Sequence, residues 1–358
     1  MLSSYAVPAN EGCSGTSGTK TLTLAAAGSF ANDDLILIHQ TRGTGAGTWQ
    51  LNKIVSGATT TTLTLKYDLT NTYIDSGASQ AQVIEMNQYE DMTTGAITAP
   101  DWDGSKGGIL AWFDKGTTTV GGAISLSEKG FRLGAYPGTN QRAAFAGEGT
   151  VGGSVRQTSA NGNGGGGGSS NNDSVGESGG GAGGGNATAG QNGDQSGSST
   201  RGIGGLLAGN SALTSCVFGG GSGGGSALYS DGGGANGKIG GGIAFIFAKD
   251  IVTTGSVISK GGDGQSVNNG YFGSSGGGAG GSILLKCETA TLGTNLITAP
   301  AGARSEGGSG SSDGGAGSVG RIHIDYSKSF TGTTSPTIDS TLDTTITAGG
   351  GSNMFMWL

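Results

Sequence analysis

Few side chains in this chain could carry out acid–base chemistry. Of its 358 residues only His39 and His323 are histidines, and each follows apolar residues in an alternating segment, LILIHQ or RIHIDY. Successive side chains of a strand point to opposite faces, so we expect both rings on the solvent face, opposite their apolar neighbours. No GxSxG, HExxH or Walker motif is present. The sequence therefore predicts that the protein is not an enzyme.

One carboxylate pair is the exception to weigh. Asp101 and Asp103 alternate around Trp102, and in a strand both carboxylates would share a face about 6.5–7 Å apart. Glycoside hydrolases use two carboxylates about 5–9.5 Å apart, and the indole ring could stack on a sugar. A polysaccharide-cleaving enzyme is therefore an alternative. Asp-Trp-Asp-Gly is also typical of a turn, and we favour the turn.

Metal and cofactor sites are not expected. Asp231, Asp263 and Asp313 lie beside glycines and could offer oxygen ligands to calcium, but they do not match the calcium-binding nonapeptide repeat. Aspartates in turns are the better interpretation. Glycine runs such as GGGIAF lead into strands and lack the strand–GxGxxG–helix context of a dinucleotide site.

Composition restricts the fold class. Glycine supplies 80 residues and proline only 5, which excludes collagen. Charged residues are 12%, the net charge is −7 and no Lys/Arg cluster occurs, so a nucleic-acid partner is not expected. The three cysteines show no pattern, and no apolar run reaches the roughly 18 residues of a membrane span. Short apolar clusters between glycine-rich segments predict an all-β fold.

An internal repeat organises the second half of the chain. Each cycle has a glycine run, an apolar strand, a second strand and a glycine-rich return. Successive cycles open 40 and 39 residues apart, at Ile243, Ile283 and Ile322. The second strands follow after 14 residues, at Val257 and Ile297, and an earlier copy contains Ile109 and Ile124. A repeat of this length predicts a stacked β structure, with the first coil capped near Trp102.

The predicted organisation is a small N-terminal β domain followed by a glycine-rich β-solenoid or polyglycine-helix region. Residues 1–19 are expected to form an arm, and 20–98 a barrel or sandwich-like platform of short alternating strands. The repeat region covers 99–326 and contains a long insertion at 136–239. Residues 327–358 are expected to form a C-terminal β segment with an apolar terminus.

Two interpretations compete for the insertion. Its glycine runs, which include 164–168, 179–185 and 219–225, could be a flexible low-complexity linker. They could instead form extended polyproline-II-like helices that pack side by side and bond backbone to backbone. Ordering glycine is entropically costly, so only a dense network of hydrogen bonds could offset it. The similar length of the runs favours packing.

The glycine runs at 162–185, 219–242, 261–281 and 302–320, alternating with polar segments, resemble the glycine-rich tail-fibre adhesins of T-even-type bacteriophages. The resemblance covers about two thirds of the chain and rests on pattern. It implies a polyglycine sandwich carrying variable loops that contact a bacterial receptor. The longer strands AFIFA and SILLK depart from that family. They resemble glycine-rich β-solenoid surface proteins of bacteria, as does the lead-in at 30–113.

The loops between glycine runs are the candidate receptor-binding sites. Aromatic side chains there supply contact area at little entropic cost, as in antibody loops. In the alternative, the aromatic rings fill gaps in the glycine scaffold. The candidate residues are Tyr229, Asp231, Asn268, Asn269, Tyr271 and Phe272.

The last five residues are apolar and would be a liability if exposed. We expect Phe355, Trp357 and Leu358 to pack into the chain's own core, a trimer axis or a partner protein. They are the candidate attachment residues.

The N-terminus shows neither the basic region nor the apolar stretch of a secretory signal, which favours a virion component that leaves the cell by assembly and lysis. The predicted function is a non-enzymatic phage fibre or tail-tip adhesin on the virion surface. Expected partners are a host glycan or outer-membrane protein, other virion proteins and further copies in a homotrimer. The alternatives are a head fibre or capsid-decorating protein, and a bacterial extracellular adhesin or filament subunit.

Overall fold

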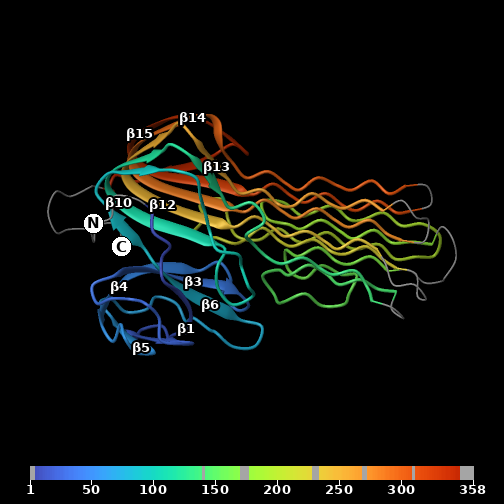
Figure 1. Ribbon diagram of the computed structural model, residues 1–358, viewed down its shortest axis with the longest axis horizontal. Coiled ribbons are helices and arrows are strands. Elements are labelled where there is room, and N and C mark those ends of the chain that lie inside the picture. Colours follow the sequence, from blue (N-terminus) through green and yellow to red (C-terminus); the bar gives the residue numbers. More distant parts are fainter. Residues whose placement is uncertain are drawn as a thin grey trace.

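The computed structural model shows a small barrel, a curled parallel sheet and a long glycine-rich bundle that projects from them (Figure 1). The described residues are 5–138, 142–169, 177–227, 234–267, 272–308 and 311–346. Every helix or strand assigned within these residues is a strand, so the predicted all-β class is confirmed. The same residues contain no helix long and apolar enough to cross a bilayer.

The barrel is closed by antiparallel strands in the order β1-β2-β5-β4-β3-β6. Their bounds are β1 Asn10–Ser14, β2 Thr21–Leu24, β3 Leu35–Arg42, β4 Trp49–Ser56, β5 Thr62–Leu65 and β6 Gln80–Glu85. In β2 and β5 every leucine is buried and every threonine exposed, the pattern of strands with one solvated face. Leu22, Ile36, Ile54 and Val83 meet inside the barrel.

β3 is buried on both faces because the barrel packs against the parallel sheet. Ile36 and Ile38 point into the barrel, whereas Leu35 and Leu37 belong to the core between barrel and sheet. His39 is fully buried, so the prediction that its ring faces solvent is wrong. An unbroken run of four apolar residues is typical of a strand covered on both faces, and that signal outweighs the alternation.

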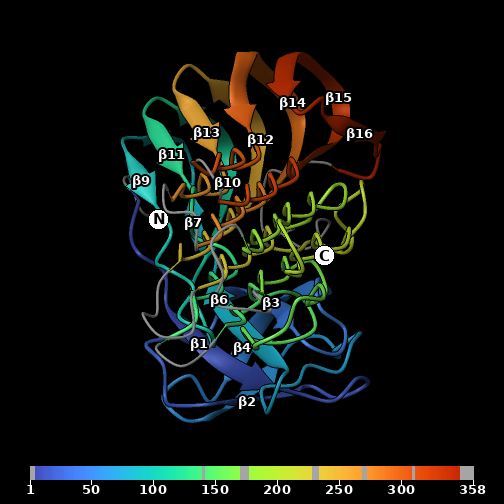
Figure 2. The same cartoon turned by 90° about the vertical axis from the view of Figure 1, so that its right-hand side faces the viewer.

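The parallel sheet has the strand order β7-β10-β12-β14-β13-β11-β9. Its strands are β7 Asn87–Tyr89, β8 Met92–Thr94, β9 Ile97–Thr98, β10 Ile109–Val120, β11 Ala123–Ser125, β12 Ile243–Thr253, β13 Ser256–Ile258, β14 Ser282–Thr298, β15 Arg321–Ser335 and β16 Asp339–Leu342. Off the main order, β8 pairs with β10, β15 with β14 and β16 with β15. Figure 2 shows these strands stacked above the barrel.

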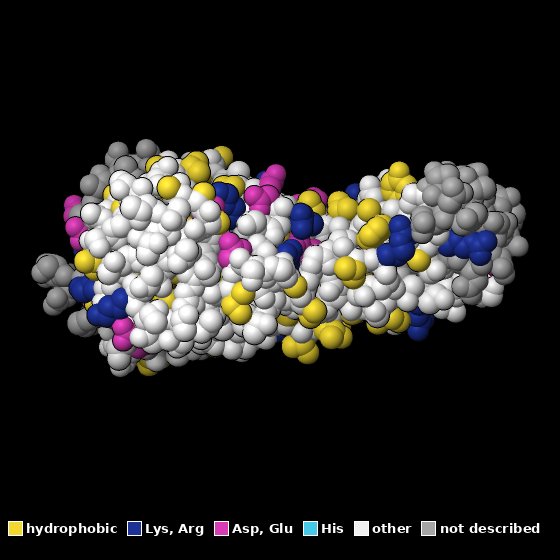
Figure 3. Space-filling model, turned by 90° about the horizontal axis from the view of Figure 1, so that it is seen from below, with side chains coloured by type: hydrophobic (Ala, Val, Ile, Leu, Met, Phe, Trp, Pro, Cys, Tyr) yellow, Lys and Arg dark blue, Asp and Glu magenta, His cyan; other side chains and the backbone are white. Residues whose placement is uncertain are grey.

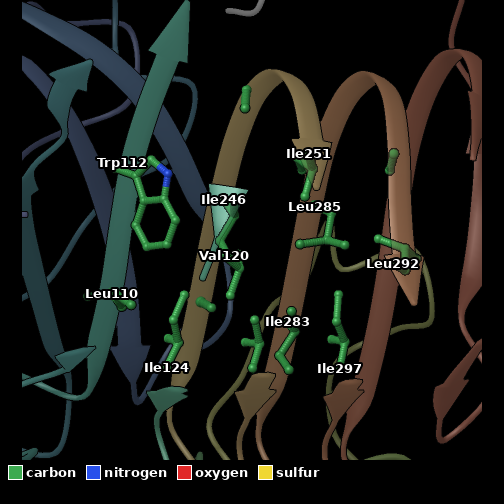
Figure 4. Packing of buried hydrophobic residues seen from close by; sticks show 14 of the residues in the cluster. Leu110, Trp112, Val120, Ile124, Ile246, Ile251, Ile283, Leu285, Leu292 and Ile297 are labelled. Carbon is green, nitrogen blue, oxygen red and sulfur yellow. The ribbon is translucent and has the colours of Figure 1, made fainter. Parts of the chain in front are cut away.

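The long strands curl over a hydrophobic interior. β14 pairs with β12 along its first part and with β13 at its end, so one strand lines both limbs of the bend. Trp112, Ile246, Ile283 and Leu285 point between the limbs (Figure 4). Fully burying an aliphatic or aromatic side chain contributes roughly 1.5–3 kcal/mol, so this interior is a main source of the sheet's stability.

The repeat predicted from the sequence is present in the sheet, but one alignment was wrong by one residue. Ile243 pairs with Ser282 rather than Ile283, whereas Ile283 does pair with Ile322. A one-residue shift moves a side chain to the other face. Ile243 therefore lies in the core toward the barrel and Ile283 in the curled interior. The second strands pair as predicted, Ile124 with Val257 and Val257 with Ile297.

Strand pairing differs from the expected boundaries at two places. β1 belongs to the barrel although it lies in the expected arm, 1–19. β7, β8 and β9 lie in the expected platform, 20–98, but β7 and β8 pair with β10 and β9 pairs with β11. Pairing alone does not define folding units, so the division into domains stays a prediction.

The glycine-rich bundle is made of chain segments that lie side by side outside the strands (Figure 1). It comprises residues 131–138, 142–169, 177–227, 234–242, 259–267, 272–281, 299–308 and 311–320. In its central run, 219–226, the hydrogen-bond partner recurs at every third residue. Gly220 and Gly223 donate N–H to the carbonyls of Gly185 and Ala182, at 3.1 and 2.9 Å. The intervening residues donate to two other segments in the same rhythm.

This central run has six neighbours. Its N–H groups donate to segments 235–241, 179–185 and 145–148, and its carbonyls accept from three others, around 131–134, 165–168 and 273–279. A Cβ atom added at Gly223 would lie 1.9 Å from the carbonyl oxygen of Gly166. Only glycine permits backbones to approach so closely, and this explains why the runs are nearly free of side chains.

Candidate functional site at the far end of the glycine-rich bundle

Many segments of the bundle end close together at its far end, away from the barrel (Figure 1). Five internal stretches lie outside the described residues: 139–141, 170–176, 228–233, 268–271 and 309–310. The described residues beside them hydrogen-bond to one another across segments. These bonds are Ala227 N–H to Arg142 O, Gly273 N–H to Ser226 O, Ser312 N–H to Ser178 Oγ and Gly308 N–H to Val267 O. We call this end of the described bundle the far end.

Buried serines cross-link the far end. Ser178 Oγ lies 3.1 Å from Ser312 Oγ and 3.3 Å from Ser196 Oγ. Ser199 Oγ donates to the carbonyl of Ser178 at 2.6 Å, and Gly179 N–H donates to Ser226 Oγ at 2.9 Å. Serine is small enough to replace glycine at the edge of the bundle, and its hydroxyl both donates and accepts. The serines thus tie neighbouring segments together.

Charged side chains accompany the serines. Arg304 forms ion pairs with Asp313 and, at 3.6 Å, with Asp194. The Arg304 side chain is about half exposed and that of Asp194 more so, so both reach solvent. Nearby, the guanidinium of Arg156 lies 4.5 Å from the centre of the Phe145 ring. Figure 3 shows Lys and Arg side chains spread along the bundle between apolar ones.

Most of the predicted receptor-binding residues lie outside the described residues: Tyr229, Asp231, Asn268, Asn269 and Tyr271. Phe272 is described and half-buried, directly before Gly273 of the far end. The predicted attachment residues Phe355, Trp357 and Leu358 also lie outside the described residues.

A buried carboxylate joins the bundle to the rest of the molecule, and the sequence reasoning missed it. Glu148 is fully buried in the bundle and pairs with Arg42 of β3 and with Arg132, whose Nε lies 2.9 Å away. The indole N–H of Trp102 donates to the same carboxylate at 3.0 Å. A buried carboxylate needs such partners to offset its loss of hydration. No local sequence pattern predicts the contacts of Glu148, because its partners are 16 to 106 residues away in sequence.

His39 forms a second link between barrel and bundle. Its Nε2 lies 2.8 Å from the carbonyl oxygen of Cys216, and its Nδ1 lies 2.9 Å from Thr41 Oγ1. A carbonyl only accepts, so Nε2 carries the proton. Burial lowers the pKa of His39 to about 4, although the hydrogen bond to Cys216 opposes this shift. The ring is therefore neutral over the physiological range.

The aspartates that the sequence singled out are engaged in turns and ion pairs. Asp103 Oδ1 accepts the N–H groups of Ser105 and Lys106 at 2.7 and 2.9 Å, as in the favoured turn. Asp101 pairs with Lys129. Trp102 is buried, with its ring 5.5 Å from that of Phe218, so it offers no open platform for a sugar.

Asp263 and Asp313 likewise bind protein groups. Asp263 accepts the Ala303 N–H at 2.8 Å and the Lys260 ammonium at 2.6 Å. The bond from the Ala303 N–H, followed by that from Lys260, lowers the pKa of the Asp263 carboxyl. Asp313 pairs with Arg304 and accepts the Gly307 N–H at 2.6 Å. Asp231 lies outside the described residues.

No family model and no curated protein matches the chain. Among solved structures, the tailspike protein gp49 from Pseudomonas phage LKA1 aligns with 93% of this chain and 63% of its own, at 10% sequence identity. The chain therefore spans less than two thirds of that tailspike chain. The TM-score is 0.20, too low for this likeness to support an argument about fold or function.

Proposed function

We propose that the protein is a non-enzymatic virion component, a fibre or tail-tip adhesin that contacts the host surface through the far end of its glycine-rich bundle. The observation that carries the proposal is the meeting of five pairs of flanking residues at that one end. The described residues of the bundle hydrogen-bond among themselves. The bundle would then keep its structure when the sequences between the flanking residues change, and a recognition surface requires such tolerance.

We infer that the support consists of polyglycine helices with three residues per turn. Such a helix presents the same face every third residue. The recurrence of hydrogen-bond partners at every third position of 219–226 supports this inference. We also infer that the curled sheet is a short β-solenoid. Ile243 pairs with Ser282 and Ser282 pairs with Arg321, so the chain returns to the same position in the neighbouring strand after 39 residues each time, which supports this inference.

The proposed receptor is a glycan or an outer-membrane protein. Tyr229, Asn269 and Tyr271 combine aromatic and amide groups, which suit both kinds of surface. Arg304 and Asp194 would add exposed charges at the far end. No glycan cleavage is expected, since Asp101 and Asp103 are held by Lys129 and by backbone N–H groups.

Two further contacts complete the proposal. The barrel end and the C-terminal residues Phe355, Trp357 and Leu358 attach the protein to other virion proteins.

Copies of the chain associate as trimers through aliphatic side chains that are exposed along the bundle: Val151, Val155, Ile203, Leu206 and Leu207. Sedimentation equilibrium tests this point, because Leu206→Ser with Leu207→Ser should convert the trimer to a monomer. A wild-type monomer would contradict it.

Binding of purified, labelled protein to a panel of intact bacterial strains tests the function. One variant carries Gly/Ser sequences at 228–233 and 268–271, and a control carries them at the exposed barrel turn, 59–61. The proposal expects wild type and control to bind a strain that the first variant does not bind, with equal melting temperatures for all three. Binding of the variant equal to wild type, or no binding to any strain, would contradict recognition and favour a structural role in the virion.

A further inference from the structure

The last strand of the sheet is attached largely by polar contacts. Among the described strands β16 pairs only with β15, and all four of its residues are exposed. His323 of β15 lies directly opposite Asp339 of β16 in the pairing register. Its side chain is only 1% exposed, so the sequence-based prediction of a solvent-facing ring is wrong here as well. The buried ring is the main side-chain link between the two strands.

Both ring nitrogens of His323 face carboxylates. Nδ1 lies 2.9 Å from Oδ2 of Asp339, and Nε2 lies 3.0 Å from Oδ1 of Asp325. An ionised carboxylate only accepts hydrogen bonds, so both nitrogens must donate. Neutral imidazole has one N–H and imidazolium has two. The geometry therefore fits the protonated ring, and the neutral ring would leave one carboxylate facing a lone pair.

We propose that His323 is a pH-operated clasp, which as imidazolium holds β16 against β15 and on losing its proton lets β16 separate from the sheet. This inference is independent of the function proposed above. It assigns a role to a buried titratable group that the far end and the barrel contacts do not use.

The charges around the clasp favour release when the ring is neutral. Lys286 of β14 lies 3.9 Å from both Asp325 and Asp343, the latter in the turn after β16. With the ring protonated, two cations face three carboxylates, those of Asp325, Asp339 and Asp343. With the ring neutral, one cation remains, and the carboxylates of β15 and β16 repel each other.

Two further described neighbours of the ring are uncharged, and Arg321, two residues before it on β15, donates to the carbonyls of Asn186 and Ala208 instead. Leu284 is its partner on β14, and Thr341 Oγ1 of β16 lies 3.4 Å from Nε2. Ile346, which is buried after β16, belongs to the apolar core under the sheet. When the ring deprotonates, the contacts that remain are backbone pairing, the apolar contacts of Ile346 and Ile338, and the ion pair between Lys286 and Asp343.

The direction of the pKa shift agrees with this geometry. Burial by itself lowers the pKa of His323, but the hydrogen bonds and charges of Asp325 and Asp339 outweigh it, so the pKa is raised above its usual value of 6.5. Stabilisation from a raised pKa is complete below the unfolded pKa and is lost as pH rises through the folded one. β16 is therefore bound at mildly acidic pH and released on the alkaline side.

Imidazole NMR and amide hydrogen exchange on the full chain test the clasp. The chain has two histidines, so its long-range ¹H–¹⁵N spectrum shows two rings, and His39 stays neutral down to a pH of about 4. We expect the His323 ring to titrate above pH 6.5. The protection of β16 amides, corrected for intrinsic exchange, should fall over the same range, tenfold for each unit by which the pKa is raised. Protection of β12 should stay constant.

Two variants separate the clasp from a general loss of fold. His323→Gln should leave β16 weakly protected at every pH, while β12 remains protected. Ser340→Ala is the matched control on the same strand, because Ser340 is exposed and lies opposite Ile324 rather than the ring, and it should keep the pH dependence of wild type. Titration of His323 at or below pH 6.5, or equal pH dependence of β16 protection in wild type and His323→Gln, would overturn the proposal.

Discussion

In the strand body, which is formed by β1–β16, hydrogen bonds run between strands and large side chains fill the space between layers. In the glycine-rich bundle the backbones themselves fill that space. Phe245 shows the first arrangement, since its ring lies 5.1 Å from Trp49 and 6.1 Å from Phe247. Gly223 shows the second, because any side chain there would collide with Gly166. The packing of the strand body thus requires large side chains, whereas the packing of the bundle requires that side chains be absent.

The two regions also bear different costs of folding. Ordering glycine costs more conformational entropy than ordering any other residue, by roughly 0.5–1 kcal/mol relative to alanine. The bundle buries few large apolar side chains that could offset this cost. Hydrogen bonds in three directions from each run, together with close backbone contact, have to do so. Buried side chains such as Glu148 and His39 then join the bundle to the barrel.

The largest effect is expected where a side chain is removed from the strand body. Phe245→Ala would leave a cavity between the barrel and the sheet, where the ring is fully buried. We expect the free energy of unfolding to fall by about 3–5 kcal/mol, measured by urea denaturation. Loss of less than about 1 kcal/mol would show that side-chain packing at this interface does not support the body.

A comparable effect is expected from acid at the link between body and bundle. The pKa of His39 is lowered to about 4 from 6.5, so its stabilisation is present above pH 6.5 and is lost as pH falls to about 4. A shift of that size corresponds to about 3 kcal/mol. Urea denaturation from pH 7.5 to 4 measures it. His39→Gln should remove this component of the pH dependence, and an unchanged acid profile in that variant would refute the assignment.

A smaller loss is expected where a methyl group is added to the bundle. In Gly223→Ala the new Cβ would meet backbone, so several segments must shift, and we expect a loss of about 1–3 kcal/mol in thermal or urea unfolding. Gly138→Ala is the matched control, because a Cβ there meets no atom within 4 Å. Equal stability of the two variants would mean that the central run is not tightly packed.

The smallest effect is expected at the far end. The ion pairs of Arg304 with Asp194 and Asp313 are partly exposed to solvent, and surface pairs contribute about 0–1 kcal/mol. Arg304→Ala should leave the melting temperature almost unchanged. A large drop in melting temperature would show that these ion pairs stabilise the bundle, and would contradict their assignment to a contact surface.

The sequence was informative wherever a pattern is local. Alternation in TLTL and the spacing of Ile124, Val257 and Ile297 predicted strands and pairings that the structure contains. The prediction failed where register depends on both faces of a strand. Ile243 and Ile283 look equivalent in sequence, yet they face different cores, because the two residues that follow each of them are apolar and alternation gives no direction.

The site was harder to predict than the fold. Glu148, His39 and His323 act through partners far away in the chain or on a neighbouring strand, and their burial follows from how the parts pack. A histidine at the polar position of a strand looks solvent-facing until another layer covers it. The predicted loop residues, apart from Phe272, lie outside the described residues, so their role in binding stays a prediction.

Amide hydrogen exchange across the glycine runs tests the central claim most directly. Residues 179–185 and 219–225 contain almost nothing but glycine, and every N–H group in them except that of Gly179 donates to a backbone carbonyl, so slow exchange there reports hydrogen bonds within the bundle. The account predicts protection of these amides comparable to that of β12. Exchange at the rate of an unfolded glycine chain, with β12 still protected, would show that the runs are linkers and would remove the support on which the far end depends.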